Sequence, residues 1–298
     1  LIMKKYEFIE SDFKIISGSR VMRIRALVSF GQVAAGDHGG YLESEENLSH
    51  EGDCWVADEA LVFQNASVHD SAIVRGNATV KRRAKVGGFA TIDGNAFVGD
   101  NAVVDGKALV TEFGKILGSA HVSGSAVVCD RAKVFGAAKV SDRAVISGAA
   151  YVCGRARVYE FAECFDECMV SDQAQVLGSA RIYNEASIRG AAIIDGNARV
   201  LGNAMIDEQA AAHDQVKVYG SAIMNGFSSA FGESHICGEA MLSDHVVVAD
   251  NAEVSGSSIL RDGARVFGSA KIGGEALIAK DANVDYDVFD EVVSGPRS

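Results

Sequence analysis

The stretch GSARIYNEASIRGAAIIDGNARVLGNAMID, residues 178–207, carries an alanine at every sixth position, and a branched aliphatic residue follows each alanine two positions later. The alanines are Ala180, Ala186, Ala192, Ala198 and Ala204, and the branched residues are Ile182, Ile188, Ile194, Val200 and Ile206. The same six-residue period runs from residue 60 to residue 288. Alanine occupies 31 of the 39 positions in this phase, and Val, Ile or Leu occupies 34 of the 38 positions two residues later. Because the phase never shifts, the sequence predicts a repeat without inserted loops.

Each six-residue repeat is typical of a short strand followed by a corner. Residues two apart point to the same side of an extended chain, so the alanine and the branched residue face inward together. Two positions after the branched residue, Gly occurs 20 times and Asp 10 times, and both residue types suit a turn with unusual backbone angles. Such short strands are stable when coils stack, because each strand then pairs with the strands above and below it.

This pattern, A-x-[VI]-x-G-x without pause, resembles the hexapeptide repeat of left-handed parallel β-helices. The resemblance implies three six-residue sides per coil and a left-handed winding, which is an exception to the usual right-handed crossover. The 229 residues from 60 to 288 then divide into about 12.7 coils. We therefore expect an all-β fold, a single-stranded left-handed parallel β-helix of about 12–13 triangular coils with an N-terminal β cap.

The residues before the repeats predict a separate N-terminal cap. Residues 1–53 alternate like strands around a Ser-Gly-Ser turn, and we expect them to cap the open end of a repeat region at 54–288, with 289–298 as a tail whose Phe289 and Val292 fold over the far end. The string GDHGGYLESEENLSHEGDCWV (36–56) before the hexapeptides resembles the YdcK-like branch of the trimeric LpxA-like proteins of bacteria and prophages. That resemblance implies trimers and an acyltransferase label derived from the fold.

Composition narrows the function classes. The net charge of −12 opposes nucleic-acid binding, which needs a basic face. No run of 18 apolar residues and no charged-then-apolar leader is visible, so we expect no membrane partner and a cytoplasmic location. The six cysteines form no CxxC pair, which favours free thiols in a reducing compartment over a metal site.

Outward positions 18 residues apart should stack in columns, and two of these columns are apolar. They predict interfaces at Ile73, Leu109, Val127 and Val145 and at Met205, Ile223, Met241, Ile259 and Leu277. Exposed apolar stripes usually mark contacts with another surface. The simplest partner is a second copy of the chain, which gives a dimer or a trimer. The alternative is that these residues are present only because they fit strands.

Candidate chemistry centres on a single histidine. Stacking at 18 residues places His213 over Asp195, and a carboxylate there could orient a general base. An exposed surface pair is the alternative. An acyltransferase of this family would use acetyl-CoA or another acyl-CoA, but the uninterrupted coils lack the loops that usually shape its cleft. Otherwise no cofactor is expected.

Two further groups of polar residues have competing interpretations. Corner acids such as Asp100, Asp130 and Asp172 could bind a cation, but turn residues that accept backbone N–H groups are the preferred interpretation. The segment before the repeats holds a second group, and a polar, turn-rich surface is preferred there over a site. Its members are Asp37, His38, Glu43, Glu45 and His50.

Three function classes therefore stay open. The first is a rigid non-catalytic scaffold or binding protein that self-associates through its exposed apolar stripes and is of phage or prophage origin. The second is an acyl-CoA-dependent acyltransferase. The third is a carbohydrate-binding, fibre-like module in which Phe165, Tyr183 and Tyr219 stack on sugars. The absence of loops favours the first class over the second, since a fold carries no function without a site.

Overall fold

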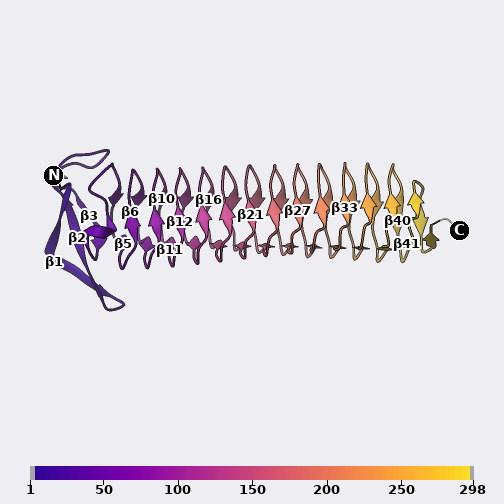
Figure 1. Ribbon diagram of the computed structural model, residues 1–298, viewed down its shortest axis with the longest axis horizontal. Helices are drawn as coiled ribbons and strands as arrows, with labels where there is room; N and C mark the ends of the chain where they lie inside the picture. Colours follow the sequence, from indigo (N-terminus) through magenta and orange to yellow (C-terminus); the bar gives the residue numbers. More distant parts are fainter. Residues whose placement is uncertain (1–3, 296–298) are drawn as a thin grey trace. The chain divides into compact units, whose positions relative to one another are not determined.

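The computed structural model describes residues 4–295, in two compact units, Leu1–Gly148 and Ala149–Ser298. Within the described part there is no α-helix; the single helical element is the short 3-10 turn η1 (Glu45–Asn47). Residues 1–3 of the expected cap and 296–298 of the expected tail lie outside the described residues. In each unit, two- and three-residue strands form parallel rungs on three sides of the chain's path (Figure 1).

Unit 1 has three faces, each named after one outward residue. The Ile73 face holds β4 (Trp55–Val56), β7 (Ile73–Val74), β10 (Thr91–Ile92), β13 (Leu109–Val110), β16 (Val127–Val128) and β19 (Val145–Ile146). The Leu61 face holds β5 (Leu61–Val62), β8 (Thr79–Val80), β11 (Phe97–Val98), β14 (Lys115–Ile116) and β17 (Lys133–Val134). The Ser67 face holds β6 (Ser67–Val68), β9 (Lys85–Val86), β12 (Val103–Val104), β15 (His121–Val122) and β18 (Lys139–Val140).

Unit 2 is built in the same way. The Tyr151 face holds β20 (Tyr151–Val152), β23 (Met169–Val170), β26 (Ser187–Ile188), β29 (Met205–Ile206), β32 (Ile223–Met224), β35 (Met241–Leu242), β38 (Ile259–Leu260), β41 (Leu277–Ala279) and β44 (Val292–Ser294). The Arg157 face holds β21 (Arg157–Val158), β24 (Gln175–Val176), β27 (Ile193–Ile194), β30 (Ala211–Ala212), β33 (Ser229–Ala230), β36 (Val247–Val248), β39 (Arg265–Val266) and β42 (Asn283–Val284). The Glu163 face holds β22 (Glu163–Cys164), β25 (Arg181–Ile182), β28 (Arg199–Val200), β31 (Lys217–Val218), β34 (His235–Ile236), β37 (Glu253–Val254), β40 (Lys271–Gly273) and β43 (Val288–Phe289).

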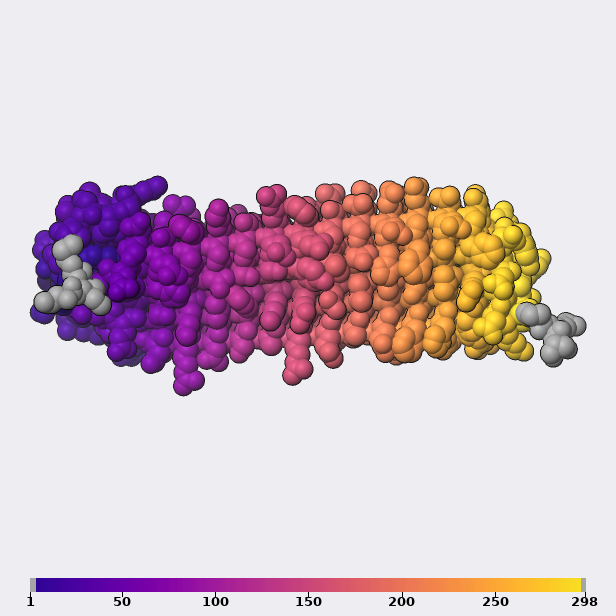
Figure 2. Space-filling model, turned by 45° about the horizontal axis from the view of Figure 1, so that its top comes forward, coloured from indigo at the N-terminus to yellow at the C-terminus, as the bar shows by residue number. Residues whose placement is uncertain are grey.

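The register confirms the expected parallel β-helix of hexapeptide coils. Thr91 pairs in parallel with Ile73 on one side and with Leu109 on the other, so each turn takes 18 residues. Between residues 4 and 295, the Ile73 face of unit 1 has six rungs and the Glu163 face of unit 2 has eight, which makes 14 against the 12–13 coils expected. The number is larger because Trp55–Val56 lies before residues 60–288, from which the expected number was calculated, and because Val288–Phe289 forms a rung in a shortened last turn. In Figure 2 the rungs of each unit appear as parallel ridges of side chains.

The interior of the coils contains the alanine and branched positions, as the pattern predicts. Ala198 and Val200 are completely buried, while Arg199 between them is exposed. Serine replaces alanine at Ser228, Ser234 and Ser258, and all three are also completely buried. The core therefore accepts a small hydroxyl where alanine normally lies.

Each corner turns through a residue in the left-handed region. At the corner after β11, Asp100 has φ 60°, and Gly118 occupies the same corner one turn later with φ 69°. Asp100 Oδ2 accepts the Gly118 N–H at 2.9 Å. This bond between successive turns recurs at other acidic corners, for example from Gly178 N–H to Glu160 and from Gly232 N–H to Asp214. The corner acids are therefore turn residues that also join neighbouring coils.

The chain before the coils forms a hairpin followed by a third strand. β1 (Tyr6–Ile16) and β2 (Ser19–Ala26) are antiparallel, and β2 is antiparallel to β3 (His38–Leu42). β3 in turn pairs in parallel with β5, so it is the first rung of the Leu61 face (Figure 1). Gly39 makes this approach possible, because a Cβ there would lie 2.6 Å from both Ile24 and Trp55.

The regular step ends near residue 284. Val288 pairs with Ile272, and Val292 pairs with Leu277, so these partners are fewer than 18 positions apart. Phe289 and Val292, which we expected to fold over the far end, remain 52% and 73% exposed. Phe289 instead packs beside Gly273 on the neighbouring rung.

Candidate functional site

His213 and Asp195 lie side by side on the Arg157 face of unit 2. Each side chain directly follows a rung, and the two rungs, β27 and β30, pair in register. His213 Nδ1 lies 2.8 Å from Asp195 Oδ1, and the two side chains are 25% and 35% exposed. The carboxylate fixes the orientation of the imidazole, which is what a general base needs.

The side chains that surround this pair are uncharged. The His213 ring stacks on Phe231 with centroids 5.0 Å apart and an interplanar angle of 11°. The outward residues of the neighbouring rungs are Ile193, Ala211 and Ser229, which offer no charge to the phosphates of an acyl-CoA. The pair can hold a proton at Nε2, but these residues do not form an anion-binding surface next to it.

The predicted interface residues form two columns, one in each unit. In unit 1, Ile73, Leu109, Val127 and Val145 point outward from the Ile73 face, and each is half-buried. In unit 2, Met205, Ile223, Met241, Ile259 and Leu277 point outward from successive rungs of the Tyr151 face. Met241 and Ile259 are 38% and 41% exposed. Parallel pairing thus joins the apolar side chains of the unit 2 column without a gap, whereas in unit 1 Thr91 lies between Ile73 and Leu109.

The aromatic residues assigned to sugar stacking cover one another in part. Phe165 and Tyr183 stack with centroids 5.0 Å apart at 2°, and Tyr219 meets His235 edge-on at 6.3 Å. A hydrogen bond with Cys237 raises the pKa of Tyr219 to about 12. Phe165 and Tyr183 are both half-buried. The outward residues of the same two rungs, Glu163 and Arg181, form an ion pair at 3.0 Å.

The polar group before the coils separates into two places. Glu45 and His50 lie near the N-terminus, where Lys4 donates to Glu45 and His50 stacks on Tyr6. Asp37 and His38 instead line a pocket elsewhere in unit 1. Within residues 4–295, no three His, Cys, Asp or Glu side chains lie together as a metal site requires.

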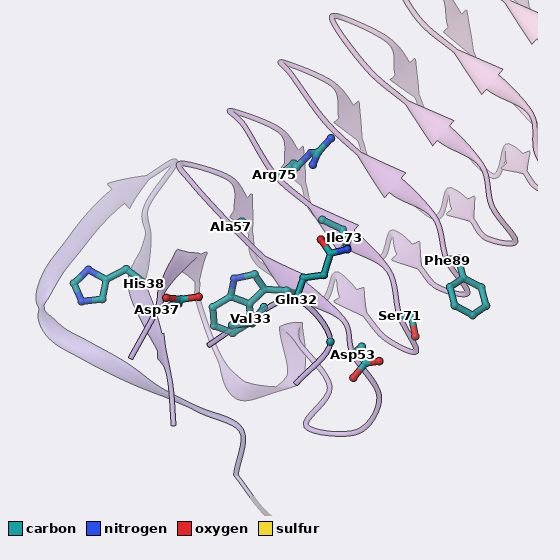
Figure 3. Close-up of a pocket in the computed structure, with 12 residues that line it drawn as sticks. Gln32, Val33, Asp37, His38, Asp53, Ala57, Ser71, Ile73, Arg75 and Phe89 are labelled. Carbon is teal, nitrogen blue, oxygen red and sulfur yellow. The ribbon is translucent and has the colours of Figure 1, made fainter. Parts of the chain in front are cut away.

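That pocket, of about 520 Å³, is the feature that sequence reasoning missed (Figure 3). One side comes from the turn Phe30–Val33, closed by backbone bonds of 3.0 and 2.8 Å, and the other comes from the first rungs of the Ile73 face. Its lining comprises Gly31, Gln32, Val33, Asp37, His38, Asp53, Trp55, Ala57, Ser71, Ile73, Arg75 and Phe89. Asp37, His38 and Trp55 were visible in the sequence, but the turn belongs to no repeat, so no spacing indicated that it would lie against the first rungs.

A smaller pocket of about 380 Å³ opens on the Leu61 face. Lys81, Arg82 and Lys115 line it beside Phe97, and Asp100 pairs with Arg82. The Lys81 ammonium lies 5.1 Å from the centre of the Phe97 ring, so a cation–π contact occupies part of this basic surface.

No protein-family model matches the chain, and no curated protein is significantly similar to it. The hexapeptide-repeat architecture therefore rests on the geometry of the coils, and membership of the YdcK-like branch stays a prediction. None of the helical segments in the described part of the chain is long and apolar enough to cross a membrane.

Proposed function

We propose that this chain is a rigid, non-catalytic β-helical scaffold that self-associates through the Tyr151 face of unit 2. The observation that carries the proposal is the outward column on that face, which runs from Tyr151 to Leu277 and is apolar at every rung except that of Ser187. Four of its side chains, Tyr151, Met169, Met241 and Ile259, are each 37–41% exposed. Such exposure in one straight line costs free energy unless a second surface covers it.

A second copy of the chain is the partner that fits best. A straight stripe is complementary to itself, and a closed symmetric dimer or trimer buries it without leaving free ends. At about 4.8 Å per rung, the seven steps from Tyr151 to Leu277 span about 34 Å, and a face about 15 Å wide then buries about 1,000 Å² in total per pair. That area is at the lower limit for a specific interface, so we expect association that depends on concentration.

The remaining parts of the proposal rest on the resemblance of the repeat. They are a left-handed winding, a cytoplasmic location in a bacterium, and a phage or prophage origin. The rigidity has a separate basis, because every rung is bonded to its neighbours and each acidic corner adds a bond between turns.

The test is the double substitution Ile223→Glu and Met241→Glu. We expect the fold to remain intact and the oligomer to dissociate, because both positions are outward and four carboxylates would meet across a two-fold contact. The matched control is Arg199→Glu with Lys217→Glu, which changes two outward positions on the Glu163 face. Molar mass by light scattering over a hundredfold concentration range is the readout. A wild-type chain that is monomeric throughout, or a double variant with unchanged mass, contradicts the proposal.

A second candidate is acyl transfer from acetyl-CoA, and it is favoured by the 2.8 Å contact between His213 and Asp195. In that reaction His213 would remove the proton of the acceptor, and Asp195 would stabilise the resulting imidazolium. Calorimetric titration with acetyl-CoA is the first measurement. Saturable binding in the micromolar range that His213→Ala alters would favour the enzyme, and no heat up to millimolar ligand would exclude it.

A further inference from the structure

The pocket between the turn Phe30–Val33 and the first rungs of the Ile73 face has the size and lining of a binding site. Its volume of about 520 Å³ lies within the range of small-ligand sites. The floor is apolar, with Ile73 and Ala57, while polar side chains from both the turn and the coils surround it (Figure 3). The pocket belongs entirely to unit 1 and shares no residue with the Tyr151 face.

Trp55 offers a hydrogen-bond donor to the pocket that it lines. Its side chain is 6% exposed, and its indole N–H is not among the buried polar atoms that lack a partner in residues 4–295. A tryptophan at a binding site combines a large apolar ring with one polar donor. An acceptor on a bound ligand would bond to this N–H in place of water.

The charges of the pocket oppose an anion. Arg75 is already paired with Asp93 at 2.8 Å, and Asp37 accepts the Ala34 N–H at 2.8 Å. Asp53 has no hydrogen-bond or ion-pair partner among the described residues, so its carboxylate is open to a donor. A phosphate or carboxylate ligand would face two acidic side chains and only one, already neutralised, arginine. Hydroxyl groups fit better, because each donates to a carboxylate and accepts from an N–H.

An exposed aromatic ring completes the site. Phe89 is 67% exposed at the edge of the pocket, an unfavourable position for so large an apolar side chain. A ring compound with C–H groups on one face can cover it, while its hydroxyls reach the polar lining. Gln32, His38 and Ser71 each offer both donors and acceptors to such hydroxyls.

We propose that this pocket binds a neutral saccharide, with Trp55 donating to a sugar oxygen, Asp53 accepting from a hydroxyl and Phe89 packing on a ring face. A simple amine would pair with Asp53 but would offer no acceptor to the Trp55 N–H. A nucleotide or an acyl-CoA would bring phosphates to an acidic pocket. The saccharide is the ligand class that satisfies the donor, the acceptor and the apolar surface together.

The chain carries one tryptophan and seven tyrosines, so emission excited selectively at the tryptophan reports on this pocket. The full chain is first applied to an array of neutral and acidic glycans, and the strongest neutral ligand is then titrated while Trp55 emission is followed. We expect a saturable change in emission, weakened about tenfold by Asp53→Asn, which removes one charge-assisted bond.

A pocket-filling variant provides the second measurement. Ala57→Tyr places a ring inside the pocket, and Thr111→Tyr introduces the same side chain three turns later, at the equivalent outward position of the same face. We expect loss of binding in the first variant and retention in the second, with similar melting temperatures. No neutral glycan bound, undiminished binding in both Asp53→Asn and Ala57→Tyr, or saturation by spermine or ATP in place of a sugar would each overturn the proposal.

Discussion

The coils and the segment before them hold the chain together by different means. In the coils, a residue contacts its counterpart 18 positions away, as Met205 contacts Ile223. In residues 4–53, contacts have no fixed spacing: the Lys5 ammonium, 4% exposed, donates to the carbonyl oxygen of Cys54, 49 positions away, at 2.9 Å. The repeat gives uniform faces, and the irregular segment contributes the turn Phe30–Val33 to the larger of the two pockets described above. The proposed saccharide site therefore lies where the irregular segment meets the first repeats.

The largest expected effect comes from breaking the periodic core. Val200→Asp places a carboxylate where the side chain is completely buried, and we expect the free energy of unfolding to fall by roughly 4 kcal/mol or more. Arg199→Asp, the matched control, changes the outward neighbour on the same strand and should leave stability within about 0.5 kcal/mol. Thermal melting followed by circular dichroism measures both. Equal melting temperatures for the two variants would show that the inward register is wrong.

The same glycine-to-alanine change should have unequal effects in the two regions. At Gly39 a Cβ would lie 2.6 Å from Ile24, Trp55 and the Val56 carbonyl oxygen, and we expect a loss of about 1–3 kcal/mol with altered Trp55 emission. Gly114 occupies an inward position that alanine fills in most repeats, but a Cβ there would lie 2.9 Å from the Val128 carbonyl oxygen, so we expect Gly114→Ala to lose about 1 kcal/mol, less than Gly39→Ala. Chemical denaturation followed by fluorescence and circular dichroism compares them. A larger loss at Gly114 than at Gly39 would remove the distinction.

The smallest expected effect concerns the bonds between corners. The Gly118 N–H lowers the pKa of Asp100, and backbone N–H groups do the same for Asp70 and Asp130. A lowered folded-state pKa means that the stabilisation is complete above the unfolded value near 3.8 and is lost as pH falls through the folded value.

Asp100→Gly removes the bond to the Gly118 N–H and the ion pair with Arg82, while keeping a residue that suits the left-handed corner. We expect its melting temperature to be about 1–3 °C lower than that of the wild type at pH 7, because the carboxylate is partly exposed and the effect is small. The two proteins should converge as pH falls through the lowered pKa of Asp100. A difference that is constant from pH 7 to pH 2.5 would assign the loss to the backbone and not to the carboxylate.

The sequence predicted the coils because two regular spacings, six residues per side and 18 residues per turn, determine their geometry. Six-residue spacing determined which side of each strand faces inward, and 18-residue stacking placed His213 beside Asp195 and aligned Met205 with Ile223. Corner acids were expected to accept backbone N–H groups, as Asp100 does. The shortened last turn at Val288 was not foreseen. Val288 is only one of eight residues other than alanine at the alanine positions, so it did not mark the end of the repeat.

The pocket could not be predicted by the same reasoning. The turn Phe30–Val33 comes to Trp55 through a tertiary contact, in which the rings of Phe30 and Trp55 lie 5.5 Å apart edge-on. No spacing rule connects those positions, and β-pattern alone does not say where a non-repeating loop will lie. The Gly-Gly pair of β3 was visible in the sequence, but its role depends on how closely β3 approaches β2 and the first rung.

The constant offset between rungs makes the length of unit 2 adjustable in whole units. Removal of residues 187–204 would place Met205 where Ser187 now lies, so that Met205 would pair with Met169. Each later residue would keep its face. Removal of only 187–192 would turn everything downstream by one side, so that Ile223 and Met241 would leave the face of Tyr151 and continue the charged one. Insertions or deletions of whole coils therefore change only the length of the solenoid. Insertions or deletions of part of a coil change which residues share a face.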